Sequence, residues 1–197
     1  MEAALLQLVN DKPFIICSIS LGTNVVAEML TGAIEPNGLI LAGPCLSGDG
    51  FVLDKMMLPG ADLSAVFAEN VPEESVLLYA SAASSSGYKK DLDCFLKDYH
   101  SVQGTFRSSL FANIAMGNYS DQIAIIQQVK YPVCIVFGED ENVVNTHYLD
   151  AAPIKLWNNT IYKIPSASHL ANIDAPGRLI NCCLLLLQKY FKIIGYG

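Results

Sequence analysis

The sequence predicts an α/β fold: a mostly parallel sheet with flanking helices and a helical insertion. Three short segments, at residues 14–17, 38–42 and 132–137, are long enough for strands and are apolar on both faces. Segments with apolar residues at helical spacing separate them. Strands of this kind occur where helices cover both sides of a parallel sheet. The alternation therefore indicates a parallel sheet between helical layers.

The composition favours one well-buried domain. The chain has 197 residues, of which 52% are hydrophobic and only 16% are charged. Such a chain can bury a large core and is not expected to be disordered. The net charge of −7 and the lack of a lysine and arginine cluster argue against nucleic acid or an anionic membrane surface as the main partner.

The cysteines and the apolar runs indicate a cytoplasmic protein. Cys17, Cys134, Cys182 and Cys183 stand inside apolar runs, where free cysteine behaves as a small hydrophobic residue, so we expect reduced, structural thiols. No C-x-x-C pair with zinc-like spacing occurs, and we expect neither a metal nor an organic cofactor. The N-terminal segment does not resemble a signal peptide, and no apolar run is long enough to span a bilayer.

The first strand runs into a turn that carries a serine. The strand at 14–17 is followed by the letters SISLG and then by a helix at 24–30. A strand, a sharp turn with serine and a helix form a nucleophile elbow, in which small residues two positions either side of the serine let strand and helix pass closely. Gly22 meets this demand on one side, and Ser18 replaces the usual glycine on the other. Because Ser18 would still lie on the strand, Ser20 is the candidate nucleophile.

The middle of the chain is predicted to be a helical cap at residues 51–126, inserted into a core formed by residues 1–50 and 127–197. This part contains no convincing strand. Its expected helices, separated by Pro and Gly, lie at residues 61–69, 73–83, 90–99, 105–116 and 121–128. The apolar residues that suggest a pocket for an acyl or alkyl group are Met56, Met57, Leu58, Phe106, Leu110 and Phe111.

The remaining elements continue the alternation. A helix is expected at residues 2–10, before the first strand. After the strand at 132–137 comes an acidic loop, and then a helix at 145–156, a strand at 160–164 and a last helix, which Asp174 can cap and which has Pro176 in its first turn.

Three polar residues follow predicted strands. Ser20 leaves the first strand, Asp140 the third and His169 the fourth. The carboxyl ends of parallel strands share one rim, where ligands bind, so we expect these side chains to meet. Serine, acid and histidine in this order match the chain order of the α/β-hydrolase triad.

The chain resembles the C-terminal two-thirds of an α/β-hydrolase of the small esterase and lipase-like kind. SISLGTNVVAEML is similar to the elbow and its helix, VCIVFGEDENVV to the acid strand and loop, and IPSASHLANIDAPGRL to the histidine loop and closing helix. The resemblance implies that His169 takes the proton of Ser20, that Asp140 orients His169, and that the backbone N–H of Leu21 stabilises the oxyanion.

Some alternatives stay open at this point. Asp49 or Asp54, after the second strand, could supply the acid in place of Asp140. His147 is expected to be a surface or packing residue, and His100 is expected to have no chemical role. The resemblance implies a serine hydrolase that cleaves a carboxylic ester of a small apolar acyl substrate, with a thioester or an amide as other bonds.

The family normally has several strands before the elbow, whereas about twelve residues precede the first strand here. The strand at 14–17 should then form an open edge. Three explanations stay open: the chain is a fragment or truncated product of a longer hydrolase, a completing chain supplies the missing strands, or a homo-oligomer covers the edge. The alternative function is a non-catalytic or truncated hydrolase-like protein that acts by binding a ligand or partner.

Overall fold

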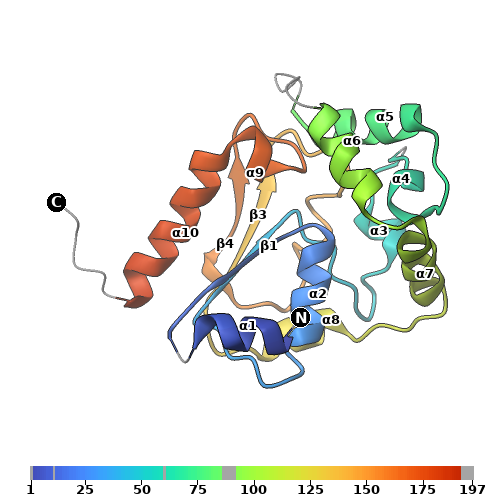
Figure 1. The fold of residues 1–197 in the computed structure, drawn as a ribbon. Coiled ribbons are helices and arrows are strands. Elements are labelled where there is room, and N and C mark those ends of the chain that lie inside the picture. Colours follow the sequence, from blue (N-terminus) through green and yellow to red (C-terminus); the bar gives the residue numbers. More distant parts are fainter. Residues whose placement is uncertain (1, 11, 60, 86–91, 192–197) are drawn as a thin grey trace.

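The computed structural model describes residues 2–10, 12–59, 61–85 and 92–191, and these form a sheet between helices (Figure 1). The strands of the sheet are parallel, in the order β1-β2-β3-β4. Their bounds are β1 (Ile16–Ile19), β2 (Leu39–Ala42), β3 (Val133–Gly138) and β4 (Leu156–Ile164). The predicted parallel sheet is confirmed.

Helices cover both faces of the sheet. Their bounds are α1 (Glu2–Val9), α2 (Leu21–Met29), α3 (Leu53–Met56), α4 (Ser64–Phe67), α5 (Glu73–Ala83), α6 (Leu92–Ser101), α7 (Gly104–Ala115), α8 (Gln122–Gln128), α9 (Ala171–Asp174) and α10 (Pro176–Phe191). Helices α2 and α8 pack on one face, against Leu39, Leu41 and Ile135. Helices α9 and α10 pack on the other face, against Ile40 and Cys134. The alternation of these neighbours along the strands explains why the two central strands, β2 and β3, are apolar on both faces.

Helices α3 to α7 lie together beside the sheet, between β2 and β3 in the sequence (Figure 1). This group corresponds to most of the proposed cap at 51–126. The boundary proposed at residue 126 runs through α8, whose buried Ile123 and Ile126 belong to the core that packs on the sheet.

The structure corrects one predicted helix. Residues 146–151 form turns, residues 152–155 are irregular, and β4 begins at Leu156, four residues before the predicted strand. The turns follow from local side-chain bonding, since the Asn145 side chain accepts the His147 N–H at 3.1 Å. The backbone N–H of Asn145 donates to Met56 across the molecule. The apolar spacing predicted a helix here, but these hydrogen bonds favour turns instead.

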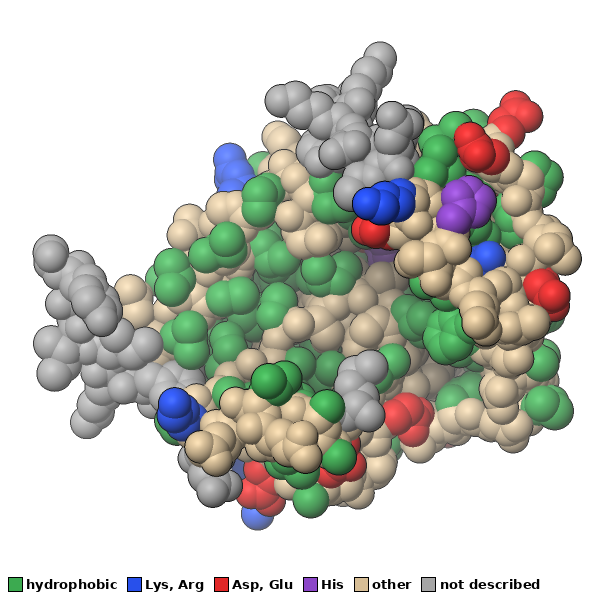
Figure 2. Space-filling model, viewed as in Figure 1, with side chains coloured by type: hydrophobic (Ala, Val, Ile, Leu, Met, Phe, Trp, Pro, Cys, Tyr) green, Lys and Arg blue, Asp and Glu red, His purple; other side chains and the backbone are tan. Residues whose placement is uncertain are grey.

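Strand β1 lies at the edge of the sheet, because β2 is its one strand neighbour among the described residues. Cys17 and Cys134 were expected to be structural thiols; Cys17 is exposed on this strand, whereas Cys134 is buried on β3. Figure 2 shows hydrophobic side chains gathered on the side of α10, where Ile180, Leu184 and Leu185 are exposed. None of the described helices has the length and apolar character needed to cross a membrane.

Candidate active site

Ser20 occupies a strained turn between β1 and α2. Its φ and ψ are 50° and −125°, in a region that residues with a side chain rarely adopt. The backbone is held there because the Ser20 N–H donates to Ala42 at 2.9 Å and the Ser20 carbonyl accepts both the N–H and the hydroxyl of Thr23. This is the backbone geometry that a nucleophile elbow requires.

Serine fits at position 18 of the elbow because strand and helix leave room for it. A Cβ added to Gly22 would lie 3.7 Å from the Cβ of Ser18, an ordinary contact distance. The Ser18 hydroxyl is buried and has no hydrogen-bond partner among the residues that the structure describes. It therefore adds a desolvation cost without a compensating bond.

Replacing Ser18 by alanine should consequently stabilise the fold. Removing a buried, unpaired hydroxyl is expected to raise the free energy of unfolding by about 1 kcal/mol. Urea denaturation of the parent and Ser18→Ala proteins measures the change. A loss of stability would show that the Ser18 hydroxyl makes a bond in solution.

His169 meets Ser20 as predicted. Its Nε2 lies 2.8 Å from the Ser20 Oγ, and its side chain is 1% exposed. Gly43 lies directly against the ring, since a Cβ at this position would lie 3.0 Å from the His169 Cε1 and Nδ1 atoms. Gly43 also has a φ of +51°, which favours glycine. The sequence contains no signal for this contact beyond the glycine that follows β2.

The acid beside His169 is Glu141 and not the predicted Asp140. The Glu141 Oε2 lies 3.1 Å from the His169 Nδ1, and both side chains are 1% exposed. The Glu141 Oε1 accepts the N–H groups of Val143 and Val144, at 2.9 and 3.1 Å. The carboxylate is therefore held by bonds on both of its oxygens.

Asp140 is exposed, and its backbone N–H donates to Ala167 at 2.9 Å. With this bond in place, the Asp140 side chain points away from His169, and the side chain of the next residue, Glu141, reaches the His169 ring. Asp49 and Asp54 are likewise exposed and have no contact with His169. His147 pairs with Asp150 on the surface, at 2.8 Å.

His100 lies on α6, 4.0 Å from the Glu73 carboxylate, with its side chain 58% exposed. Neither His100 nor His147 therefore takes part in the buried arrangement, as predicted.

The histidine loop is tied to the end of α5. The Asp174 Oδ2 accepts the N–H groups of Ser168 and Ser85, both at 2.8 Å. The Ser168 hydroxyl donates to Ala82 at 3.2 Å, and the Leu170 N–H donates to Ala83 at 2.9 Å. Asp174 was predicted to cap the last helix, and its observed bonds are to this loop instead. Ser85 is 89 residues away in the sequence, so no local pattern could indicate this partner.

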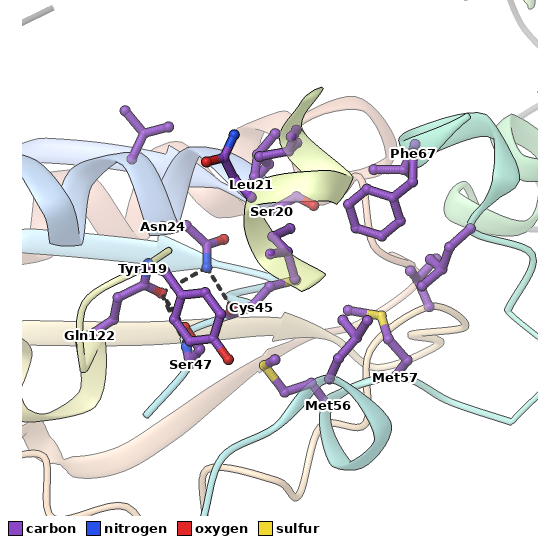
Figure 3. Close-up of a pocket in the computed structure, with 18 of the residues that line it drawn as sticks. Ser20, Leu21, Asn24, Cys45, Ser47, Met56, Met57, Phe67, Tyr119 and Gln122 are labelled. Atoms are coloured by element: carbon purple, nitrogen blue, oxygen red, sulfur yellow. Dashed lines mark hydrogen bonds between the residues drawn. The ribbon is translucent and has the colours of Figure 1, made fainter. Parts of the chain in front are cut away.

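A cavity of about 360 Å³ opens beside Ser20, between α2 and the helices α3 to α7 (Figure 3). Leu21 lines it at the start of α2, where N–H groups lack acceptors within the helix. Its apolar lining comes from both sides and includes Leu21, Val25, Met56, Met57, Leu63, Val66, Phe67, Leu110, Ile114 and Val143. The apolar residues predicted for the pocket line it in part, while Phe106 and Phe111 are exposed.

A polar network closes one side of this cavity. The Asn24 amide donates to the Cys45 carbonyl at 2.6 Å and to Gln122 at 2.8 Å. Gln122 donates in turn to the carboxylate of Glu28 at 2.9 Å. Burial acts to raise the pKa of Glu28, but the bonds from Gln122 and Ser120 outweigh it and lower this pKa. Burial raises the pKa of Cys45 to about 12, so its side chain is a neutral thiol. Within the described ranges, no cluster of His, Cys, Asp and Glu side chains could hold a metal ion.

The sequence matches no protein-family model and no curated protein, whereas many solved structures share its fold. One is N-acyl homoserine lactonase AidH in complex with N-butanoyl homoserine, with a TM-score of 0.84 and 20% identity over 98% of this chain and 70% of that chain. The chain has the α/β-hydrolase fold.

Other structures with the α/β-hydrolase fold agree. A serine hydrolase involved in carbazole degradation has a TM-score of 0.65 and 20% identity, over 95% of this chain and 70% of that chain. A serine hydrolase from the hydrocarbon-degrading bacterium Cycloclasticus zankles has a TM-score of 0.66 and 12% identity, over 98% and 70%. At these identities the likeness shows the α/β-hydrolase fold alone.

Proposed function

We propose that this protein is a serine hydrolase that cleaves a carboxylic ester, including a cyclic ester, through Ser20, His169 and Glu141. The observation that carries the proposal is the chain of contacts from the Ser20 Oγ to the His169 Nε2 and from the His169 Nδ1 to Glu141. This chain ends at the wall of an apolar cavity. A nucleophile, a base and a group that orients the base are the parts that acyl transfer needs.

In the first half of the reaction, the Ser20 Oγ attacks the carbonyl carbon while its proton passes to the His169 Nε2. Glu141 holds the Nδ1–H tautomer and stabilises the imidazolium that forms. The tetrahedral intermediate collapses when the bond to the alkoxy oxygen breaks and His169 gives that oxygen the proton. Ser20 is then acylated, and a cyclic ester leaves its alcohol on the same molecule.

In the second half, His169 takes a proton from water, whose oxygen attacks the acyl carbon. Collapse of this intermediate returns the proton to the Ser20 Oγ and releases the carboxylic acid. The backbone N–H of Leu21 is placed to donate to the oxyanion in both halves, and one such donor is worth about 3–4 kcal/mol of barrier. No step of this sequence needs a metal or an organic cofactor.

The cavity favours a substrate with an apolar acyl group. Its volume of about 360 Å³ suits a small molecule. Met56, Met57 and Phe67 line it, and side chains of this kind adapt to the shape of an alkyl chain. The lactonase with the same fold binds N-butanoyl homoserine, a ligand with a short acyl chain. An aliphatic ester or lactone with a short acyl chain is therefore the substrate class we propose, with thioesters and amides as further bonds to screen.

A fluorophosphonate probe tests this function. We expect the probe to add to the parent protein by forming a bond to the Ser20 Oγ with loss of fluoride, and to leave Ser20→Ala unmodified. Intact-mass spectrometry measures the addition, and Ser18→Ala is the matched control that should be labelled like the parent. No labelling of a parent chain that circular dichroism shows to be folded would favour the alternative, a hydrolase-like protein that acts by binding.

A further inference from the structure

We propose that Tyr79 donates its phenolic hydrogen to the oxygen of the substrate carbonyl, and so acts as a second oxyanion donor beside the Leu21 N–H. This inference rests on the proposed function and adds a catalytic residue to it. An oxyanion is stabilised best by hydrogen-bond donors from more than one direction. The Leu21 N–H is one such donor, so a second donor is needed.

Helix α5 places Tyr79 in the active site and holds it there. The carbonyls of Ala82 and Ala83, at the end of this helix, accept bonds from Ser168 and Leu170, the two neighbours of His169. Tyr79 lies one helical turn before Ala83, which is fully buried. The position of Tyr79 is therefore coupled to the loop that carries the catalytic histidine.

The Tyr79 ring packs against other side chains, whereas its hydroxyl makes no hydrogen bond among the described residues. The ring lies 6.5 Å from that of Phe95 and packs against the main hydrophobic core. The residue lines the cavity that Ser20 and Leu21 also line. Within the described part of the chain, the hydroxyl makes no hydrogen bond, so its O–H is free for a ligand in the cavity.

The phenol remains a donor at working pH. Burial raises the pKa of Tyr79 to about 12, and the side chains of Cys45 and Glu141 add to this effect. The geometric link to the reacting groups is the cavity itself, which Tyr79 lines together with Ser20 and Leu21.

Several other polar side chains at the cavity are already engaged. Both amide hydrogens of Asn24 are used, by Cys45 and by Gln122. Gln122 donates to Glu28. The Tyr119 hydroxyl also has no hydrogen bond among the described residues, but Tyr119 is exposed and lies in the loop between α7 and α8. Tyr79 is the half-buried neutral donor, and its helix is bonded to the loop of His169.

The test is Tyr79→Phe, which keeps the ring and removes the hydroxyl. With p-nitrophenyl butyrate as substrate, we expect kcat to fall by about 10²-fold, the usual effect of losing one oxyanion donor, with little change in KM. The matched control is Tyr131→Phe, since Tyr131 is half-buried beside the same core but does not line the cavity. It should keep the parent rate.

A second measurement uses an alkyl trifluoromethyl ketone, which adds to the active serine and places negative charge on its oxygen. Its inhibition constant should rise by the same factor as kcat/KM falls. If the parent hydrolyses the ester, Ser20→Ala does not, and Tyr79→Phe matches the parent in both measurements, the inference is wrong while the proposed function stands. If the folded parent neither turns over the ester nor binds the ketone, both proposals are wrong.

Discussion

Replacing Glu141 by glutamine is expected to lower kcat by about 10⁴-fold while the protein stays folded. The Glu141 Oε2 faces the His169 Nδ1, so the carboxylate accepts an N–H from that atom. Glutamine would present an N–H there and force the proton of the neutral ring onto the Nε2, where it cannot accept the Ser20 proton. A change of tautomer of this kind costs about 10⁴ in kcat in a serine protease triad.

The fold should tolerate Glu141→Gln because glutamine keeps an oxygen for the N–H groups of Val143 and Val144. The matched control is Asp140→Asn, an adjacent exposed carboxylate that should leave kcat within about twofold of the parent, since exposed substitutions away from such contacts have small effects. Ester hydrolysis by the two variants at equal concentration measures the difference. A large loss in Asp140→Asn with an active Glu141→Gln would restore Asp140 as the acid.

Of the three predicted site residues, Asp140 is the one that the structure does not place beside His169. The position of Ser20 could be predicted because Ser18 still belongs to the strand, and His169 is the one histidine in the loop after the last predicted strand. The acid loop instead carries three consecutive carboxylates, Glu139, Asp140 and Glu141. Which of them faces the histidine depends on how the loop leaves β3.

The path of the loop after β3 is set by its close contact with the histidine loop, which the sequence does not reveal. Gly138, the last residue of β3, lies so near the carbonyls of Ala167 and Ser168 that any side chain would overlap them. The bond from the Asp140 N–H to Ala167 follows, and it places Glu141 inside. The longer glutamate side chain then bridges to the ring. Which carboxylate faces His169 therefore depends on how these two loops pack against each other, which the sequence does not reveal.

The layered fold was easier to predict because its signal is local. The apolar strands specify a parallel sheet, and SISLG specifies the turn at Ser20. The region at 145–156 could not be predicted in the same way, since its turns depend on a bond to Met56 that is 89 residues away in sequence. The open edge at β1 was predicted from the short segment before it, and what covers this edge, a second copy or a completing chain, stays a prediction.

Replacing Asp174 by alanine is expected to lower the free energy of unfolding by about 3 kcal/mol. The Asp174 Oδ2 accepts two backbone N–H groups, from Ser168 and Ser85, and alanine would leave both without an acceptor. Each orphaned donor in a partly buried setting costs about 1–3 kcal/mol. The same bonds tie the histidine loop to α5, so kcat should fall as well, through the lost positions of His169 and Tyr79.

The matched control for this loss is Asp121→Ala. Asp121 caps α8 and accepts one N–H, that of Ala124, at 2.9 Å, so its removal should cost about 1 kcal/mol and leave kcat unchanged. Urea denaturation of both variants measures the two free energies. If Asp174→Ala costs no more than Asp121→Ala, the bonds of Asp174 do not hold the loop against α5. In that case the two bonds of Ser168 and Leu170 to the end of α5 would be enough to keep the loop of His169 in place.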